Sequence, residues 1–226
     1  MALTDKLSAI GDAIREKTGT TDLIPLSDMP ESIRNIQSGG GKYAPRSVYG
    51  YFFYKYKDTE LDYEVANLDT SNMTSLYQMF GNCSNLISLN LCNWNTNNIT
   101  DMSRIFYSCN ALANLDVSGW YTNNVTDMSS MFDFCRSLTD LDLSNFITSN
   151  VTNMSRMFYY CEKLRKLDIR NFTFDKVTSY STMFENVPKD CLIIVKGDTE
   201  KQWIATNFST LTNVKTLAEY QAEGGV

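Results

Sequence analysis

Residues 124–146 decide the fold, and they read NVTDMSSMFDFCRSLTDLDLSNF. The stretch recurs along the chain with a step of 26 residues, and a fixed period of about 20 to 50 residues is typical of repeat architectures. The step is kept without insertion by phenylalanines at Phe80, Phe106, Phe132, Phe158 and Phe184, by cysteines at Cys83, Cys109, Cys135 and Cys161, by asparagines at Asn72, Asn98, Asn124 and Asn150, and by large apolar residues at Leu68, Trp94, Trp120, Phe146 and Phe172. The sequence therefore predicts a solenoid, because no single unit could bury its apolar face alone.

Each unit holds two hydrophobic patterns. The first places four residues at i, i+3, i+4 and i+7, which is one face of a short helix: Met128, Met131, Phe132 and Cys135. Thr126 or Asp127 stands where the cap of that helix would lie. In the second pattern, Leu138, Leu141 and Leu143 follow the spacing Leu-x-x-Leu-x-Leu, and the last two alternate inward as in a strand. We therefore expect one helical segment and one short strand in each coil, with strands near Tyr63, Leu89, Leu115, Leu141, Leu167 and Ile193.

Residues of about 60 to 200 resemble a known repeat family. The segments 141–146, 149–158 and 161–164 are similar to the BspA-type leucine-rich repeat family. The Leu-x-x-Leu-x-Leu spacing is itself the leucine-rich-repeat pattern, and it predicts an α/β solenoid in which about six right-handed coils stack and are closed by caps. The resemblance implies a surface or secreted adhesion-type protein with no activity attached to the repeat. The ends depart from the pattern, since Tyr63 and Val65 replace the first leucines and Val187 replaces the fifth cysteine.

The chain divides into five predicted segments. Residues 1–38 form a two-helix attachment or oligomerisation element, in which Leu3, Leu7, Ile10 and Ile14 make an apolar stripe, and residues 39–42 form a glycine hinge. Residues 43–62 carry an aromatic run that we interpret as the N-terminal cap, although it could also be a platform for sugar rings. Residues 63–195 are the solenoid, and residues 196–226 are the C-terminal cap, with a helix over 200–206 and a strand over 214–217.

The first segment carries a second resemblance. Residues 13–19 together with Asp28, Met29 and Pro30 are similar to a short N-terminal module of phage tail-associated and prophage structural proteins. The resemblance implies attachment to a virus particle. It would also explain how an adhesion-type repeat leaves the cell without a visible signal peptide.

Composition excludes several classes of function. The net charge of −6 and the pI near 4.7 argue against a nucleic acid partner, because phosphate binding needs clustered lysine and arginine. No apolar run approaches the roughly 20 residues of a membrane span, so we expect a chain made in the cytoplasm without membrane insertion. The sequence contains no histidine, which removes the commonest general base and zinc ligand. We therefore expect no enzymatic activity, no cofactor and no metal.

The outward positions of the predicted strands are the best binding candidates. They are Asn90, Asp116, Asp142 and Asp168, flanked by Ser88, Asn114, Asp140 and Lys166. In leucine-rich repeats, residues between the buried leucines line the concave face. A ladder of carboxylates could hold a cation or hydrogen-bond the hydroxyls of a sugar, or it could be a solvated face that discourages aggregation. As catalytic groups they are unconvincing, since nothing separates their environments and therefore their pKa values.

Three further columns have structural interpretations. The cysteines are expected to be buried free thiols, with disulfides or metal binding as alternatives. The asparagines are expected to satisfy backbone groups in the turn before each helix. Four aromatic residues that follow the buried phenylalanines, on the convex side, could contact a partner or pack against the next coil: Tyr107, Phe134, Tyr159 and Tyr160.

Two functions compete on this evidence. In the first, the chain is a phage tail or fibre component of the virion, with residues 1–38 contacting other virion structural proteins and the repeats contacting a host cell-surface glycan or protein. A homotrimer would suit such a fibre. In the second, the chain is a bacterial cell-surface leucine-rich-repeat adhesin.

Overall fold

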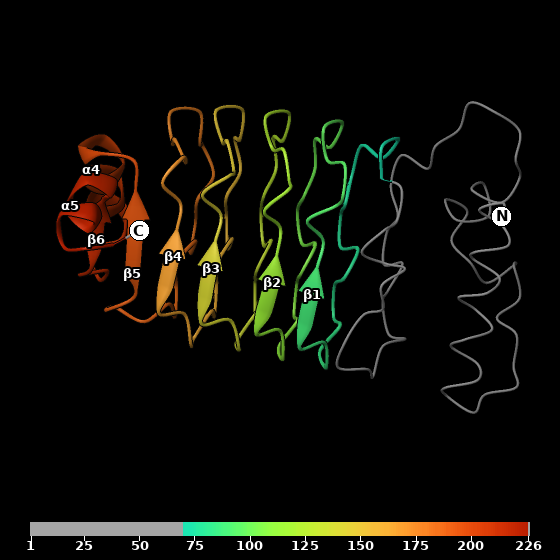
Figure 1. The fold of residues 1–226 in the computed structure, drawn as a ribbon, viewed down its shortest axis with the longest axis horizontal. Helices are drawn as coiled ribbons and strands as arrows, with labels where there is room; N and C mark the ends of the chain where they lie inside the picture. The colour runs from blue at the N-terminus through green and yellow to red at the C-terminus, as the bar shows by residue number, and fades with distance from the viewer. Residues whose placement is uncertain (1–69, 226) are drawn as a thin grey trace, which may run out of the picture.

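The structure is a computed structural model, and it describes residues 70–225 (Figure 1). The predicted two-helix element over 1–38, the glycine hinge over 39–42, the aromatic cap over 43–62 and the strand near Tyr63 lie outside these residues. The role of residues 1–38 as an attachment element therefore stays a prediction.

The described residues form a β-solenoid of about four turns, each of roughly 26 residues. One short strand per coil lies on the same side: β1 (Ser88–Asn90), β2 (Asn114–Asp116), β3 (Asp140–Asp142), β4 (Lys166–Asp168) and β5 (Leu192–Val195). Paired strands are parallel and shifted by one unit, so that Leu89 pairs with Leu115 and Leu141 with Leu167. The 26-residue register and the strand positions expected at Leu89, Leu115, Leu141, Leu167 and Ile193 are therefore confirmed. The six coils and the leucine-rich-repeat character go beyond what these residues show.

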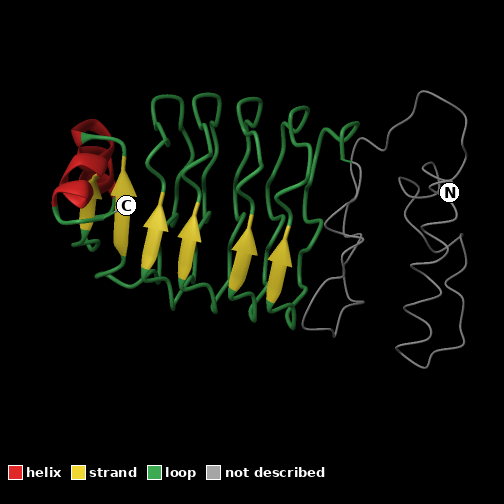
Figure 2. Ribbon diagram, in the orientation of Figure 1, coloured by secondary structure: helices red, strands yellow, loops and turns green. Residues whose placement is uncertain are grey.

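The helical segment that we expected in each coil is wrong. Figure 2 shows turns and loops where the helices should lie, and helices only at the C-terminal end. In the third coil, the Met131 N–H donates to the Met128 carbonyl at 3.3 Å and the Cys135 N–H donates to the Phe132 carbonyl at 3.0 Å, which are bonds of reverse turns. Between them, the Phe132 N–H donates to the Met157 carbonyl of the next coil at 2.9 Å.

Positive φ angles explain why turns replace the helix. In the third coil Ser130 has a φ of 53° and Phe134 a φ of 61°, and the same two positions are left-handed in every coil from Gln78 to Asn186. A left-handed residue ends an α-helix, so alternate N–H groups point to the neighbouring coil instead of back along the chain. The prediction of which side chains point inward is nevertheless confirmed, since Met128, Met131, Phe132 and Cys135 are all fully buried. Repeated turns and a helix both place residues i and i+3 on one side, so the same spacing serves either structure.

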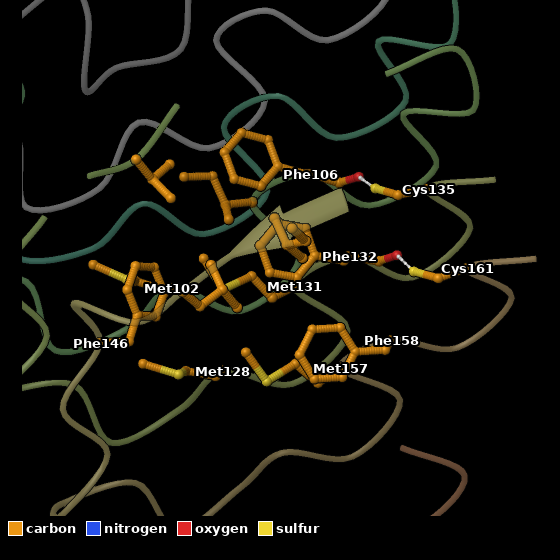
Figure 3. Packing of buried hydrophobic residues seen from close by; sticks show 14 of the residues in the cluster. Met102, Phe106, Met128, Met131, Phe132, Cys135, Phe146, Met157, Phe158 and Cys161 are labelled. Carbon is orange, nitrogen blue, oxygen red and sulfur yellow. Dashed lines mark hydrogen bonds between the residues drawn. The ribbon is translucent and has the colours of Figure 1, made fainter. Parts of the chain in front are cut away.

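The core consists of columns that run along the solenoid axis. Phe106, Phe132 and Phe158 stack with ring centroids 5.6 and 5.8 Å apart, and the methionines lie beside them (Figure 3). Trp94 and Trp120 form a second column, with centroids 6.3 Å apart. Each aromatic pair adds about 0.5–1.5 kcal/mol to the free energy of unfolding beyond the burial of its area. The coils are therefore held together by contacts that repeat at every step.

The C-terminal end closes with two helices and a strand. These are α4 (Asp198–Asn207), β6 (Val214–Thr216), which pairs in parallel with β5, and α5 (Leu217–Ala222). The helix expected over 200–206 and the strand expected over 214–217 are confirmed, whereas α5 was not expected. Trp203 of α4 stacks on Phe174 with centroids 4.0 Å apart, so α4 covers the last core layer. Among residues 70–225, no helix has the length and apolar character that crossing a membrane requires.

Candidate binding surface on the strand face

The outward side chains of the strands form two ladders, which together we call the strand face. Ser88 aligns with Asn114 and Asn90 with Asp116 across β1 and β2. Asp140 aligns with Lys166 and Asp142 with Asp168 across β3 and β4. The structure therefore brings all the sequence-predicted site residues to one side of the solenoid, but it gives them different surroundings.

The second ladder consists of the last residues of strands β1 to β4, and its side chains form the turns that end the strands. The Asn90 side-chain oxygen accepts a hydrogen bond from the Cys92 N–H at 3.0 Å, and the Asp116 carboxylate accepts one from the Ser118 N–H at 3.0 Å. Asp142 accepts from Ser144 in the same way, at 2.9 Å. These are turns that aspartate and asparagine form equally well through the same oxygen. The negative charge is therefore not needed for the turn.

The part of the strand face at β4 is covered, which corrects the sequence prediction for Lys166 and Asp168. Asp168 is only 3% exposed and forms an ion pair with Arg170, whose pKa it raises through that hydrogen bond. The Lys166 ammonium donates to the Tyr220 hydroxyl of α5 at 2.9 Å and lies 5.0 Å from the centre of its ring. Neither residue lies on an open binding face. Tyr220 is more than fifty positions away in sequence, so no local pattern could place it there.

The sheet is interrupted between β2 and β3. The strands form one sheet of β1 and β2 and a second sheet of β3, β4, β5 and β6. On either side of the break the ladder continues, because the Leu91 N–H donates to the Asp116 carbonyl at 2.8 Å and the Leu143 N–H donates to the Asp168 carbonyl at 2.9 Å. In the described part of the chain, no hydrogen bond joins β2 to β3. The turn side stays continuous there, since the Phe106 N–H still donates to the Met131 carbonyl at 3.1 Å.

An open groove of about 350 Å³ lies at this break, and we call it the strand-face groove. It is lined by four of the predicted site residues, Asn90, Asn114, Asp116 and Asp140, together with Ser88, Leu89, Ala113, Leu115 and Thr139. Leu115 is partly exposed in it, whereas its equivalents in the other strands are buried. The lining offers carboxylate and amide acceptors, amide and hydroxyl donors and a small apolar floor. Such a set can hydrogen-bond a ligand that carries hydroxyl or amide groups.

Gly119 lies in the turn after β2, next to the break. A Cβ atom at Gly119 would lie 1.8 Å from the Cys92 carbonyl oxygen, so the turn after β2 packs tightly against the preceding coil. From the following coil, the Asn145 amide reaches back to the Val117 and Trp120 carbonyls at 3.0 and 2.9 Å. Gly119 occupies the position that is asparagine at Asn93, Asn145 and Asn171. Gly197 stands at the same position after β5, where the sheet is not interrupted, so a glycine in this column does not by itself mark the break.

The cysteine column consists of free thiols, as expected. The thiols of Cys109, Cys135 and Cys161 donate to the phenylalanine carbonyls of the preceding coil at 3.1, 3.1 and 3.2 Å, two of which Figure 3 shows. Burial raises the pKa of the Cys83 thiol to about 12 and that of Cys191 to about 12 as well. Within residues 70–225, no group of three or more cysteine, aspartate or glutamate side chains is placed to hold a metal ion.

The asparagine column satisfies backbone groups, as expected, but it does so between coils and not at a helix start. The side-chain amides of Asn98, Asn124 and Asn150 donate to the carbonyls of Ser71, Asn97 and Asn123 at 2.8, 2.7 and 2.8 Å. Each amide therefore fastens one coil to the one before it.

The aromatic residues on the turn side form a connected surface. Phe134 and Tyr160 stack with centroids 4.9 Å apart, and Tyr159 lies 5.5 Å from Phe134 and 4.5 Å from Tyr160. Arg136 lies 5.0 Å from the Phe134 ring centre and 5.2 Å from that of Tyr160. All three rings are partly exposed.

Two of these rings occupy strained backbone positions. Phe134 has a φ of 61° and Tyr160 a φ of 57°. The left-handed region costs about 1–2 kcal/mol for a bulky residue and is tolerated far better by asparagine. The stacked pair returns about 0.5–1.5 kcal/mol, which offsets only part of the two costs.

Comparison with known proteins gives a match to one family model. Residues 27–114 and 74–192 match the family model described as Mycoplasma protein of unknown function, DUF285. Neither the curated proteins nor the solved structures give a match to the chain. The two matched segments overlap within the repeats and extend past the first of them, in agreement with the resemblance to BspA-type repeats. Because together they span residues 27–192, well over half of the sequence, the chain belongs to the DUF285 family of repeat proteins.

Proposed function

We propose that this chain is a non-enzymatic binding protein that attaches its carrier to a host cell surface through the strand-face groove. The carrier in this proposal is a phage virion, in which the chain is a tail or fibre component and residues 1–38 contact other virion structural proteins. The repeats would run over residues 63–195 as about six coils of leucine-rich-repeat type, which sets how far the groove stands from the anchor.

The observation that supports binding is the break in the sheet. In a solenoid that served only as a spacer, an uninterrupted sheet would be more stable, because each backbone hydrogen bond adds about 0.5–1.5 kcal/mol of stability. Here the sheet is interrupted between β2 and β3, and five outward polar side chains line the opening: Ser88, Asn90, Asn114, Asp116 and Asp140. The groove is held by strands whose inner side is a stacked aromatic core, and rigid supports favour precise binding.

The ligand in this proposal is a surface glycan or protein that presents neutral or cationic hydrogen-bonding groups. Asp116 and Asp140 place two carboxylates at the groove, and the whole chain carries a net charge of −6. Strongly anionic ligands would be repelled.

The test replaces the charges of the groove and keeps its shape. In the Asp116→Asn/Asp140→Asn double variant, residue 116 keeps the oxygen that accepts from Ser118, as Asn90 does for Cys92. Asp140 forms only a solvent-exposed ion pair with Arg165, so its loss costs little stability. The fluorescently labelled full chain is measured by flow cytometry on a panel of bacterial strains. We expect about a tenfold weaker association of the double variant with the strains that bind the wild type.

Asp142→Asn is the matched control for that test. Asp142 is exposed on the same ladder, makes the same turn contact and lies outside the groove. This variant should bind as the wild type does. Equal binding by the groove variant and the control would exclude the groove as the binding site.

The alternative carrier is the bacterial cell itself, with the chain acting as a surface leucine-rich-repeat adhesin. The resemblance to BspA-type repeats supports this alternative, because it implies a surface or secreted adhesion-type protein. Mass spectrometry of purified phage particles from a lysogenic strain decides between the two. Peptides of this chain in the particles support the virion proposal, whereas peptides released only by protease treatment of intact cells support the adhesin.

A further inference from the structure

The turn side of the third and fourth coils carries a surface that the proposed function does not use. We call it the aromatic strip, and it consists of Phe134, Tyr159 and Tyr160 with Arg136 and Arg156. Arg156 lies 3.8 Å from the Tyr159 ring centre, and Arg136 lies near both rings of the stacked pair. The five side chains therefore form one connected cluster on the turn side, in which Phe134 and Tyr160 stack and Tyr159 contacts both rings at a steep angle.

Folding does not explain the rings of Phe134 and Tyr160. Both residues occupy the second left-handed position of their coil, and the equivalent residues of the other coils are Asn82, Ser108 and Asn186. Asparagine is among the side chains that tolerate this conformation best. The core beneath is already filled, because Phe132 and Phe158 are fully buried. Two neighbouring coils thus place rings outward where the backbone favours asparagine, and strained residues of this kind cluster at binding sites.

The charges of the strip are balanced within the chain. Arg136 forms an ion pair with Glu162 at 3.1 Å. Arg156 forms one at 2.8 Å with Asp133, whose side chain is only 1% exposed, and this contact raises the pKa of Arg156. Because each guanidinium already has a carboxylate partner, the strip presents aromatic faces and paired polar groups without net charge. A neutral ligand suits such a surface better than an acidic one.

We propose that the aromatic strip is a second ligand site, separate from the strand-face groove, and that it binds pyranose units of a neutral polysaccharide. The apolar C–H face of a sugar ring packs on the partly exposed Phe134 and Tyr160 rings. Neighbouring ring hydroxyls bind the Arg136–Glu162 pair, which offers a donor and an acceptor side by side. The ion pairs and the ring stack hold these groups in place before binding, which lowers the entropy cost of association. A protein partner is the competing occupant.

The experiment replaces Phe134 and Tyr160, at the strained positions, with asparagine. Affinity gel electrophoresis of the full chain is carried out in gels that contain dextran, mannan or galactan. We expect at least one of these neutral polysaccharides to retard the wild type, and the Phe134→Asn/Tyr160→Asn double variant to lose at least about tenfold in affinity. Its melting temperature should stay within about 3 °C of the wild-type value, since strain is relieved as stacking is lost.

Two control variants separate the ring from the backbone. Ser108→Asn makes the same substitution at the equivalent left-handed position one coil earlier, outside the strip, and should keep full retardation. Tyr160→Phe keeps the ring and should also retain binding. The Asp116→Asn/Asp140→Asn variant should be retarded like the wild type, so failure of the groove and failure of the strip are told apart.

Each contrary result overturns the proposal. If no neutral polysaccharide retards the wild type, the sugar ligand is wrong. If the double variant is retarded as strongly as the wild type, the strip is not the site. If the double variant loses polysaccharide binding only because its melting temperature falls well below that of Ser108→Asn, the rings serve folding and the site is rejected.

Discussion

Around β1 and β2 the strand face is open, and within residues 70–225 no hydrogen bonds between strands join β2 to β3. From β4 to β6 every strand is paired with the next, and α5 covers this part of the face. From β1 to β5 both ends are made from the same 26-residue unit and the same inward columns, whereas β6, which pairs Val214 with Ile193, lies outside that step. The repeat therefore determines the core, whereas the surface differs between the ends: the sheet is interrupted after β2 at one end, and Tyr220 and Arg170 contact the outward residues of β4 at the other. In a protein of this kind, binding residues are best sought where a column changes residue type.

The largest effect is expected from breaking the core column at the boundary between the two ends. Phe132 stacks between Phe106 and Phe158, so Phe132→Ala should lower the free energy of unfolding by about 3–5 kcal/mol. Urea denaturation followed by circular dichroism measures this loss. Because contacts continue on the turn side across the break, we expect a single transition in the wild type. Two separate wild-type transitions would mean that the ends fold independently and that the comparison concerns two units.

A moderate effect is expected from Gly119→Ala. The added Cβ meets the Cys92 carbonyl, and an overpacked contact of this kind costs about 1–3 kcal/mol. Gly197→Ala is the matched control, because its Cβ would meet only the Glu200 side chain, at 3.8 Å. Thermal unfolding compares the two variants. Equal melting temperatures would show that Gly119 does not hold the turn after β2 against the preceding coil.

The smallest effect concerns the reactivity of the thiols at pH 8, where no change in stability is expected. Cys92, in the turn after β1, is partly exposed, whereas Cys191, just before β5, is buried. Iodoacetamide at pH 8 should therefore modify Cys92 first, as peptide mass spectrometry will show, while Cys83 and Cys191 react only after unfolding. Burial raises the pKa of Cys83 from 9.0 to about 12, so its thiol stabilises the fold below pH 9 and this contribution is lost as the pH rises towards 12. Equal modification of Cys92 and Cys191 in the folded chain would contradict the burial of the second thiol.

Much of the fold could be predicted from the sequence because the repeat is strict. The inward columns and five strand positions depend on spacing alone, and spacing is visible without a structure. The helical segments failed for a physical reason: the i, i+3 pattern is common to a helix and to repeated turns, and only the left-handed residues, such as Ser130 and Phe134, distinguish them. Serine and phenylalanine give no local sign of that conformation.

The candidate site was predicted only in part. Asn90, Asn114, Asp116 and Asp140 line the groove, as their outward positions suggested. Lys166 and Asp168 do not, because Lys166 contacts Tyr220 of the short helix α5 and Asp168 is buried in an ion pair with Arg170. The gap between β2 and β3 also depends on packing between coils, which the periodicity of one coil does not describe.

The hydrogen bonds of the turn side have a consequence for how such a protein can change its length. The Phe106 N–H donates to the Met131 carbonyl and the Phe132 N–H to the Met157 carbonyl, so one coil offers its neighbours the same partners as the next. Removal or duplication of one whole unit would leave every remaining bond with an equivalent acceptor. Recombination between units can therefore shorten or extend the protein in whole-coil increments, and its length can evolve without redesign of the core.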